Sequence, residues 1–183
     1  LKKIFDSGKP IVWTMHDMWP ATGICHYASG CNLYEKECHH CPQLYGGGSR
    51  KDISYRVFHK KRELYRNHRI TFVTCSRWLE GMARKSELLT GQNIISIPNA
   101  INTNLFKPRS KQEARSRCML PQDIKLILFG SVKITDPRKG MQYLIESCKL
   151  LAGKHPELVK ELGIVAFGNQ SKQLENLLPF KVY

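Results

Sequence analysis

Four cysteines lie close together near the start of the chain, between Trp13 and Pro42. Their spacing is Cys25-x5-Cys31-x6-Cys38-x2-Cys41, and the last pair belongs to a C-x-x-C-P sequence. A C-x-x-C turn allows two thiolates to point at one ion. Four sulfur ligands suit zinc, with iron as the competitor, because tetrahedral sulfur coordination forms a closed structural site. The spacing therefore predicts a structural metal site in this segment, named here the cysteine loop (residues 25–41).

The same four cysteines could instead form two disulfides or remain free thiols. The chain has seven cysteines, an odd number, and no secretory segment is recognisable, so we expect metal binding over disulfides. His26, His39 and His40 share the segment and could replace a cysteine ligand, although adjacent histidines in a polar loop are more often solvated. Four thiolates would fill the coordination shell, so we do not expect a catalytic metal.

The charge balance predicts an affinity for anions. The chain has 29 Lys and Arg against 15 Asp and Glu, a net charge of +14, and eight of the basic residues lie in residues 50–69. Nucleotide diphosphates, nucleic acid and acidic lipid surfaces are all compatible with this excess, and so is a solvated basic helix face. No apolar run approaches the roughly 20 residues that span a bilayer. We expect a cytoplasmic protein, with peripheral contact to an anionic membrane as an open alternative.

Short apolar runs alternate with amphipathic segments along the chain. The pattern predicts strands over residues 8–16, 69–75, 94–97, 125–130 and 163–168, and helices over 52–67, after Ser76, over 111–120 and from Gly140. In the helix over 52–67, the basic residues should face away from the apolar ones. Cys75, Cys118 and Cys148 are expected to pack in the core. The alternation predicts an α/β fold with parallel sheets. The segment 98–108 is bounded by prolines and predicts a connection between two domains.

Two places at strand ends are candidates for ligand binding. His16 and Asp17 follow the first strand, and in open α/β sheets ligands bind at the carboxyl ends of strands. A histidine there could accept a proton or hold a hydroxyl, or simply cap the loop. The loop over residues 131–139 precedes a helix start, where Lys133, Arg138 and Lys139 gather. Cations beside a helix N-terminus favour a diphosphate over a solvated loop.

Several motifs together resemble bacterial glycosyltransferases of family 4, of the kind found in capsule, exopolysaccharide and O-antigen clusters. They are WTMHD, W-x-x-T-G-x-C-H-Y with C-x-x-C-P, CSRWLEGMARKS, SIPNAINTNLFKP, LILFGS and RKG. The resemblance implies the GT-B fold, in which two doubly wound, Rossmann-like parallel-sheet domains face each other. Residues 1–106 would be the later part of the acceptor-side domain, and 107–183 the start of the domain that binds the nucleotide sugar.

The resemblance also implies an activity and its residues. Family members transfer a sugar, with retention, from a nucleoside-diphosphate sugar to a polysaccharide or lipid-linked oligosaccharide acceptor, without a catalytic metal. His16 matches the T-x-H-D histidine that lies near the transferred sugar, and Lys139 matches the lysine of the K-G pair that neutralises the leaving diphosphate. The implied donor-binding residues are the neighbours of that lysine along the chain, namely Gly130, Ser131, Lys133, Arg138 and Gly140.

The sequence departs from the family pattern in three ways. Ser131 stands where many relatives have a basic residue. The family's glycine-rich N-terminal loop is absent, and so is its downstream E-x7-E region. Apart from the family pattern, the chain begins at Leu1 rather than Met. We therefore expect a fragment that is inactive by itself. A metal-containing nucleic-acid-binding module is the alternative function, favoured by the basic charge and the cysteine spacing, and a surface for a polysaccharide-assembly partner is a third.

Overall fold

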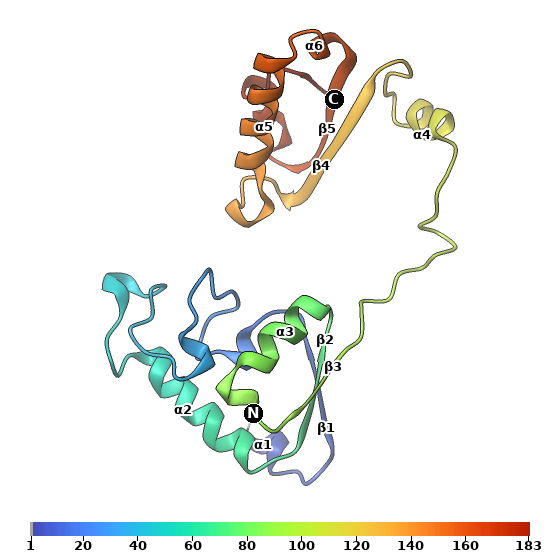
Figure 1. Ribbon diagram of the computed structural model, residues 1–183. Coiled ribbons are helices and arrows are strands. Elements are labelled where there is room, and N and C mark those ends of the chain that lie inside the picture. The colour runs from blue at the N-terminus through green and yellow to red at the C-terminus, as the bar shows by residue number, and fades with distance from the viewer. Residues whose placement is uncertain (1) are drawn as a thin grey trace. The chain divides into compact units, whose positions relative to one another are not determined.

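The computed structural model describes residues 2–183 (Figure 1). The chain divides into two compact units, one ending at Asn102 and the other running from Thr103 to Tyr183. Residues 97–110, which include the boundary, form no helix or strand. Each unit is described by itself below.

The first unit is a parallel three-stranded sheet covered by helices. Strands β1 (Ile11–Met15), β2 (Ile70–Thr74) and β3 (Asn93–Ser96) lie in the order β1-β2-β3. The helices are α1 (Lys2–Phe5), α2 (Ile53–Arg66) and α3 (Arg77–Lys85). Alternate residues of β2 are buried, as expected for a strand with one covered face. The core joins this face to the helices and includes Phe58, Tyr65, Phe72, Leu79 and Ala83.

The second unit has the same kind of architecture. Strands β4 (Lys125–Lys133), β5 (Leu162–Asn169) and β6 (Lys181–Val182) form a parallel sheet in the order β4-β5-β6. The helices are α4 (Lys111–Arg117), α5 (Met141–Lys154) and α6 (Leu158–Glu161). The core includes Ile145, Cys148, Ile164, Leu174 and Phe180. Short 3-10 turns occur in both units, at Trp19–Ala21, Leu33–Glu35, Tyr45–Gly47, Glu87–Leu89, Pro137–Lys139 and Ser171–Asn176.

These two parallel sheets confirm the predicted α/β class and are compatible with part of a Rossmann-like GT-B glycosyltransferase. The predicted helix start after Ser76 is also confirmed, and the Ser76 side chain caps α3 by accepting a hydrogen bond from the Leu79 N–H. Strand β4 is three residues longer than predicted, because an irregular pairing after Gly130 still brings Lys133 beside Asn169. Within residues 2–183, no helix is long and apolar enough to cross a membrane.

The prediction that every basic residue of α2 faces solvent is wrong for one residue. Lys61 is only 2% exposed, whereas Ile53 at the start of the helix is 49% exposed. The buried face of α2 carries Ser54, Phe58, Lys61 and Tyr65, which follow helical spacing. The expectation for the lone cysteines is also wrong at one position. Cys148 is buried, but Cys118 at the end of α4 is exposed.

Candidate functional site

Candidate site residues lie in both units, after β1 in the first and around the β4–α5 connection in the second. His16 follows β1 directly and is exposed. It therefore stands at the carboxyl end of the sheet, as predicted, with its imidazole accessible to solvent. This position suits a group that meets a ligand above the sheet edge.

Asp17 is held by a partner that the sequence did not reveal. Its Oδ1 accepts a hydrogen bond from the Trp19 N–H at 2.8 Å, and its Oδ2 lies 2.8 Å from Nδ1 of His26. Burial raises the pKa of Asp17, but the hydrogen bonds with His26 and Trp19 outweigh this effect and lower the pKa overall. The ionised carboxylate thus anchors the loop, and His26 connects the residues after β1 to the cysteine loop.

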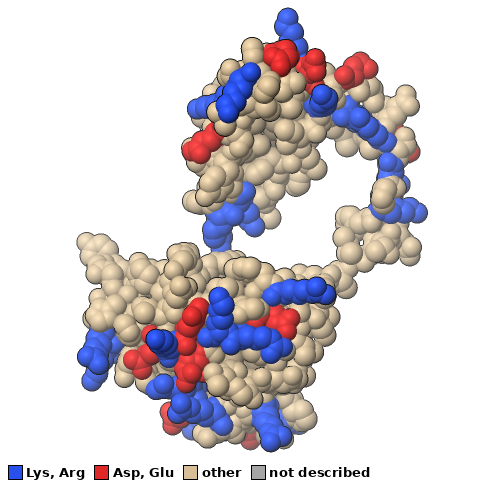
Figure 2. Space-filling view, in the orientation of Figure 1, with Lys and Arg blue, Asp and Glu red and all other residues tan. Residues whose placement is uncertain are grey.

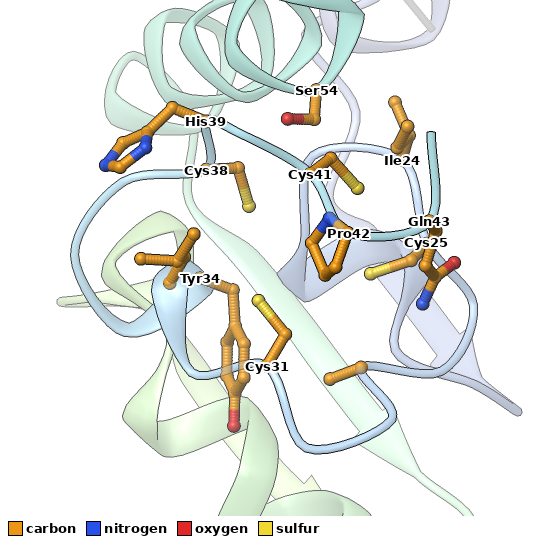
Figure 3. Close-up of a pocket in the computed structure, with 12 residues that line it drawn as sticks. Ile24, Cys25, Cys31, Tyr34, Cys38, His39, Cys41, Pro42, Gln43 and Ser54 are labelled. Carbon is orange, nitrogen blue, oxygen red and sulfur yellow. The ribbon is translucent and has the colours of Figure 1, made fainter. Parts of the chain in front are cut away.

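The four cysteines of the cysteine loop surround one small pocket. Cys25, Cys31, Cys38 and Cys41 all line a cavity of about 20 Å³ together with Tyr34 and Pro42. Figure 3 shows their sulfurs pointing toward the middle of this pocket from different parts of the loop. All four are free thiols. Burial raises the pKa of Cys38 to about 11, so its thiol is neutral near pH 7 unless a cation stabilises the thiolate.

The sulfurs share a pocket without yet forming a coordination shell. Within residues 2–183, no three His, Cys, Asp or Glu side chains are close enough together to hold a metal ion as they stand. The zinc or iron site at these cysteines stays a prediction. His39 lines the pocket too, but its Nδ1 lies 2.9 Å from Nδ1 of His40.

Asp52 fixes the C-x-x-C turn to the start of α2. One carboxylate oxygen accepts from the Cys41 N–H at 2.9 Å and from the Ser49 N–H at 3.2 Å. The other accepts from the Ser54 hydroxyl at 2.6 Å and caps the helix through the Tyr55 N–H at 3.1 Å. Burial raises the pKa of Asp52, but these hydrogen bonds outweigh it and hold the pKa far below its ordinary value. The sequence carried only a weak signal for this, an Asp one residue before a helical pattern.

Lys61 ties α2 to the turn that follows His16 and Asp17. Its Nζ donates to the carbonyl oxygen of Trp19 at 2.6 Å and to that of Thr22 at 3.0 Å, and it lies 3.5 Å from the centre of the Trp19 ring. Burial lowers the pKa of Lys61 to about 7. No carboxylate in the described part of the chain forms an ion pair with it. Its hydrogen-bond partners are thus neutral acceptors, and Asp17 acts on it electrostatically without forming an ion pair.

The β4–α5 connection, residues 131–139 in the sequence prediction, is folded rather than open. Ile134 in its middle is fully buried. Arg138 binds Asp136 in two places, with 2.9 Å between Nε and Oδ1, and its hydrogen bonds lower the pKa of that carboxyl to about 2. The predicted cluster of three cations is therefore reduced, because Asp136 offsets the charge of Arg138. Lys133 and Lys139 are exposed.

The glycines of this region have structural reasons for their identity. A side chain on Gly130 would overlap the Phe167 ring, and one on Gly168 would meet the Ser131 carbonyl oxygen. Gly140 has φ of 78° and immediately precedes α5. The Ser131 hydroxyl is buried with no hydrogen-bond partner among the described residues. Gly130, Ser131 and Gly140 thus shape the connection, while their contact with a donor stays a prediction.

Comparison with known proteins gives two partial similarities, both to glycosyltransferases. The chain is 37% identical over 57 residues to a putative colanic acid biosynthesis glycosyl transferase, WcaC, of Escherichia coli K12. It is 28% identical over 80 residues to a D-inositol 3-phosphate glycosyltransferase of Thermobispora bispora. These matches cover 31% and 44% of the chain but only 14% and 18% of the two relatives. The chain thus matches less than a fifth of the length of either relative.

No protein-family profile and no solved structure matches the chain. His16 and Lys139, the two residues expected to act on one donor, belong to different units, so their convergence stays a prediction. The fold and the two similarities support a glycosyltransferase role.

Proposed function

We propose that this chain is part of a retaining glycosyltransferase that uses a nucleoside-diphosphate sugar and extends a cell-surface polysaccharide or a lipid-linked oligosaccharide. The observation that carries the proposal is the similarity to two glycosyltransferases in a chain with two parallel α/β units. The motifs that resemble family 4 support the finer assignment, because they are spread along the chain from Trp13 to Gly140.

In the proposed reaction, the bond between the anomeric carbon of the donor sugar and the diphosphate oxygen breaks. The oxygen of an acceptor hydroxyl forms the new bond to the anomeric carbon, negative charge builds on the leaving diphosphate, and the proton of the hydroxyl passes to that diphosphate. A fixed cation near that charge stabilises the transition state. Lys139 is our candidate for this cation. Its exposed side chain stands just before α5, whose first free N–H groups also favour an anion.

In the acceptor-side unit, the proposal assigns His16 to bind the transferred sugar. Its neighbour Asp17 is committed to His26 and Trp19 and is therefore a positioning residue in this proposal. Because Asp17 holds the turn that follows β1, the imidazole of His16 leaves the sheet from a fixed backbone. The proposal assigns the donor contacts of the second unit to Lys133 and Lys139 first, since Arg138 is engaged by Asp136.

The charge distribution gives no specific support to the nucleic-acid alternative. On the face shown in Figure 2, Lys and Arg side chains are interspersed with Asp and Glu. Lys61, one of the basic residues on which that alternative drew, is buried. A nucleic-acid surface would require a continuous basic stripe with aromatic residues for base stacking.

The experiment that tests the proposal is a donor screen with the chain in its native polypeptide. UDP-, GDP-, ADP- and dTDP-sugars are incubated with and without membrane-extracted acceptor, and the release of nucleoside diphosphate is measured. Release that depends on one donor supports the proposal, and the anomeric configuration of the product, read by NMR, tests retention. A folded protein that binds and cleaves none of these donors would refute it.

A further inference from the structure

The pocket in the cysteine loop has the composition of a metal site. Four thiols meet in a cavity of about 20 Å³, which is the room that one small ion or water requires. All four are free thiols, so none of the sulfurs is used in a disulfide. The pocket does not belong to the proposed sugar-transfer residues, so the inference below does not depend on that function.

The backbone around the pocket is arranged to support thiolates. The Gly23 N–H donates to the sulfur of Cys38 at 3.3 Å, and Gly23 has no room for a side chain because a Cβ would meet the Ser54 carbonyl oxygen. The Cys41 N–H is held by Asp52. An N–H directed at sulfur stabilises the negative form of that sulfur. Such hydrogen bonds to the ligands are typical of the shell around a bound metal.

Lys61 is connected to the pocket through Thr22 and Gly23, because its Nζ donates to the Thr22 carbonyl oxygen and the next residue, Gly23, donates to the Cys38 sulfur. Its ammonium is buried and is held by two carbonyl oxygens and a ring, which satisfy its N–H groups without neutralising its charge. A buried charge without a counter-charge costs several kcal/mol. Cys38, Cys25 and Asp17 all act electrostatically on Lys61, in that order of size. Negative charge on the two sulfurs would therefore add to the counter-charge that Asp17 supplies.

We propose that Cys25, Cys31, Cys38 and Cys41 bind one zinc ion, and that the Lys61 ammonium offsets the surplus negative charge of the complex. Each thiol loses its proton to solvent as its sulfur bonds to the ion. Four thiolates carry more negative charge than one zinc ion neutralises, so a buried complex needs a cation nearby. Binding requires the cysteine side chains to move closer together, because no three of the described ligand-type side chains can hold an ion as they stand.

The first test measures metal and thiols in the purified chain. Elemental analysis should find one zinc per chain, and cobalt substitution should produce the sulfur-to-cobalt charge-transfer absorption of a thiolate site. Denatured protein without reductant should show all seven thiols. Iron in place of zinc, no retained metal, or a thiol count reduced by disulfides would each overturn the assignment. Cys38→Ser should abolish the cobalt absorption, whereas Cys118→Ser, at an exposed cysteine, should leave it unchanged.

The second test isolates the charge of Lys61. Lys61→Gln keeps a donor for the two carbonyl oxygens but removes the charge, and Lys60→Gln makes the same change at the exposed neighbouring residue. In competition with a chelating dye, Lys61→Gln should weaken zinc binding roughly 10- to 100-fold, the usual effect of losing a supporting group. Tryptophan fluorescence confirms folding of both variants. Equal zinc affinity of the two folded variants would show that Lys61 does not balance the site.

Discussion

Replacing Asp52 by Ala should destabilise the first unit more than any surface carboxylate would. The Asp52 side chain is 8% exposed and accepts hydrogen bonds from three backbone N–H groups and one hydroxyl. Alanine removes all of these acceptors at once. It leaves the Cys41 N–H without a partner, in a part of the loop where the surrounding backbone is already packed against α2.

The size of the effect follows from the contacts. Loss of a helix N-cap costs about 1 kcal/mol. An orphaned buried donor costs about 1–3 kcal/mol, so the Cys41 N–H adds about 2 kcal/mol, whereas Ser49 is exposed and water can replace its lost acceptor. The expected loss in the free energy of unfolding is therefore about 3 kcal/mol, which is roughly a hundredfold in the equilibrium constant. The total free energy of unfolding of a small domain is about 5–15 kcal/mol, so a loss of this size should be easily measured.

The assay is urea unfolding followed by tryptophan fluorescence. All three tryptophans, Trp13, Trp19 and Trp78, belong to the first unit, so this signal reports on it alone. Asp6→Ala is the matched control, because Asp6 is an exposed carboxylate of the same unit. The urea concentration at the midpoint of unfolding should fall for Asp52→Ala, with little change in the dependence of the unfolding free energy on urea. If the two variants unfold at the same urea concentration, the reasoning from buried acceptors is wrong.

The same residue predicts a dependence on pH. Because the pKa of Asp52 is lower in the folded chain than its ordinary 3.8, the folded state binds fewer protons than the unfolded state below that pH. The contribution of Asp52 to stability is thus complete above about pH 4 and is lost as the pH falls further. The stability difference between the native chain and Asp52→Ala should shrink with acid, and a difference that stays constant down to pH 2 would contradict this.

Three further predictions concern the second unit and the surface. Gly168→Ala should destabilise the second unit by about 2 kcal/mol or more, because Gly168 has φ of 116° and its new methyl group would overlap the Ser131 carbonyl. Circular dichroism should show an unfolding transition at lower temperature, while the transition of the first unit, followed by tryptophan fluorescence, stays unchanged. In the native polypeptide, Lys139→Ala should lower kcat about 100- to 1,000-fold with an active donor. Lys149→Ala, at an exposed residue of α5, is the control and should leave kcat unchanged. Equal kcat values for the two variants would show that Lys139 does not act in the mechanism. Finally, the exposed cations of α2 and its flanks are expected to contact an anionic membrane, with about 1 kcal/mol of binding free energy for each cation. Flotation should then recover more protein with anionic than with neutral vesicles. Equal recovery would reject the contact.

Local pattern was sufficient to predict most helices and strands of this chain, but not α1, α6 or β6. Alternating apolar runs gave β1, β2, β4 and β5 within a few residues, and the Ser76 cap set the start of α3. These features depend on backbone geometry over a few neighbouring residues, so they can be seen in sequence. The clustering of the four cysteines around one pocket was likewise anticipated by their spacing.

The partners of charged side chains could not be predicted in this way. Helical spacing puts Lys61 on the same face as Phe58 and Tyr65, but burial of a lysine is energetically costly. Carbonyl oxygens 42 and 39 residues away reduce this cost here, because they accept its hydrogen bonds. Asp17 binds His26 and Arg138 binds Asp136, so two groups considered for ligand binding are engaged within the protein.

The sequence by itself thus determined where most strands and helices form and that four cysteines would line one pocket, because periodicity and short spacing are local properties of the chain. Only the tertiary structure decided which charges are buried, which are paired and which remain at the surface. Those outcomes depend on donors and acceptors that distant segments bring together, and no local pattern encodes them.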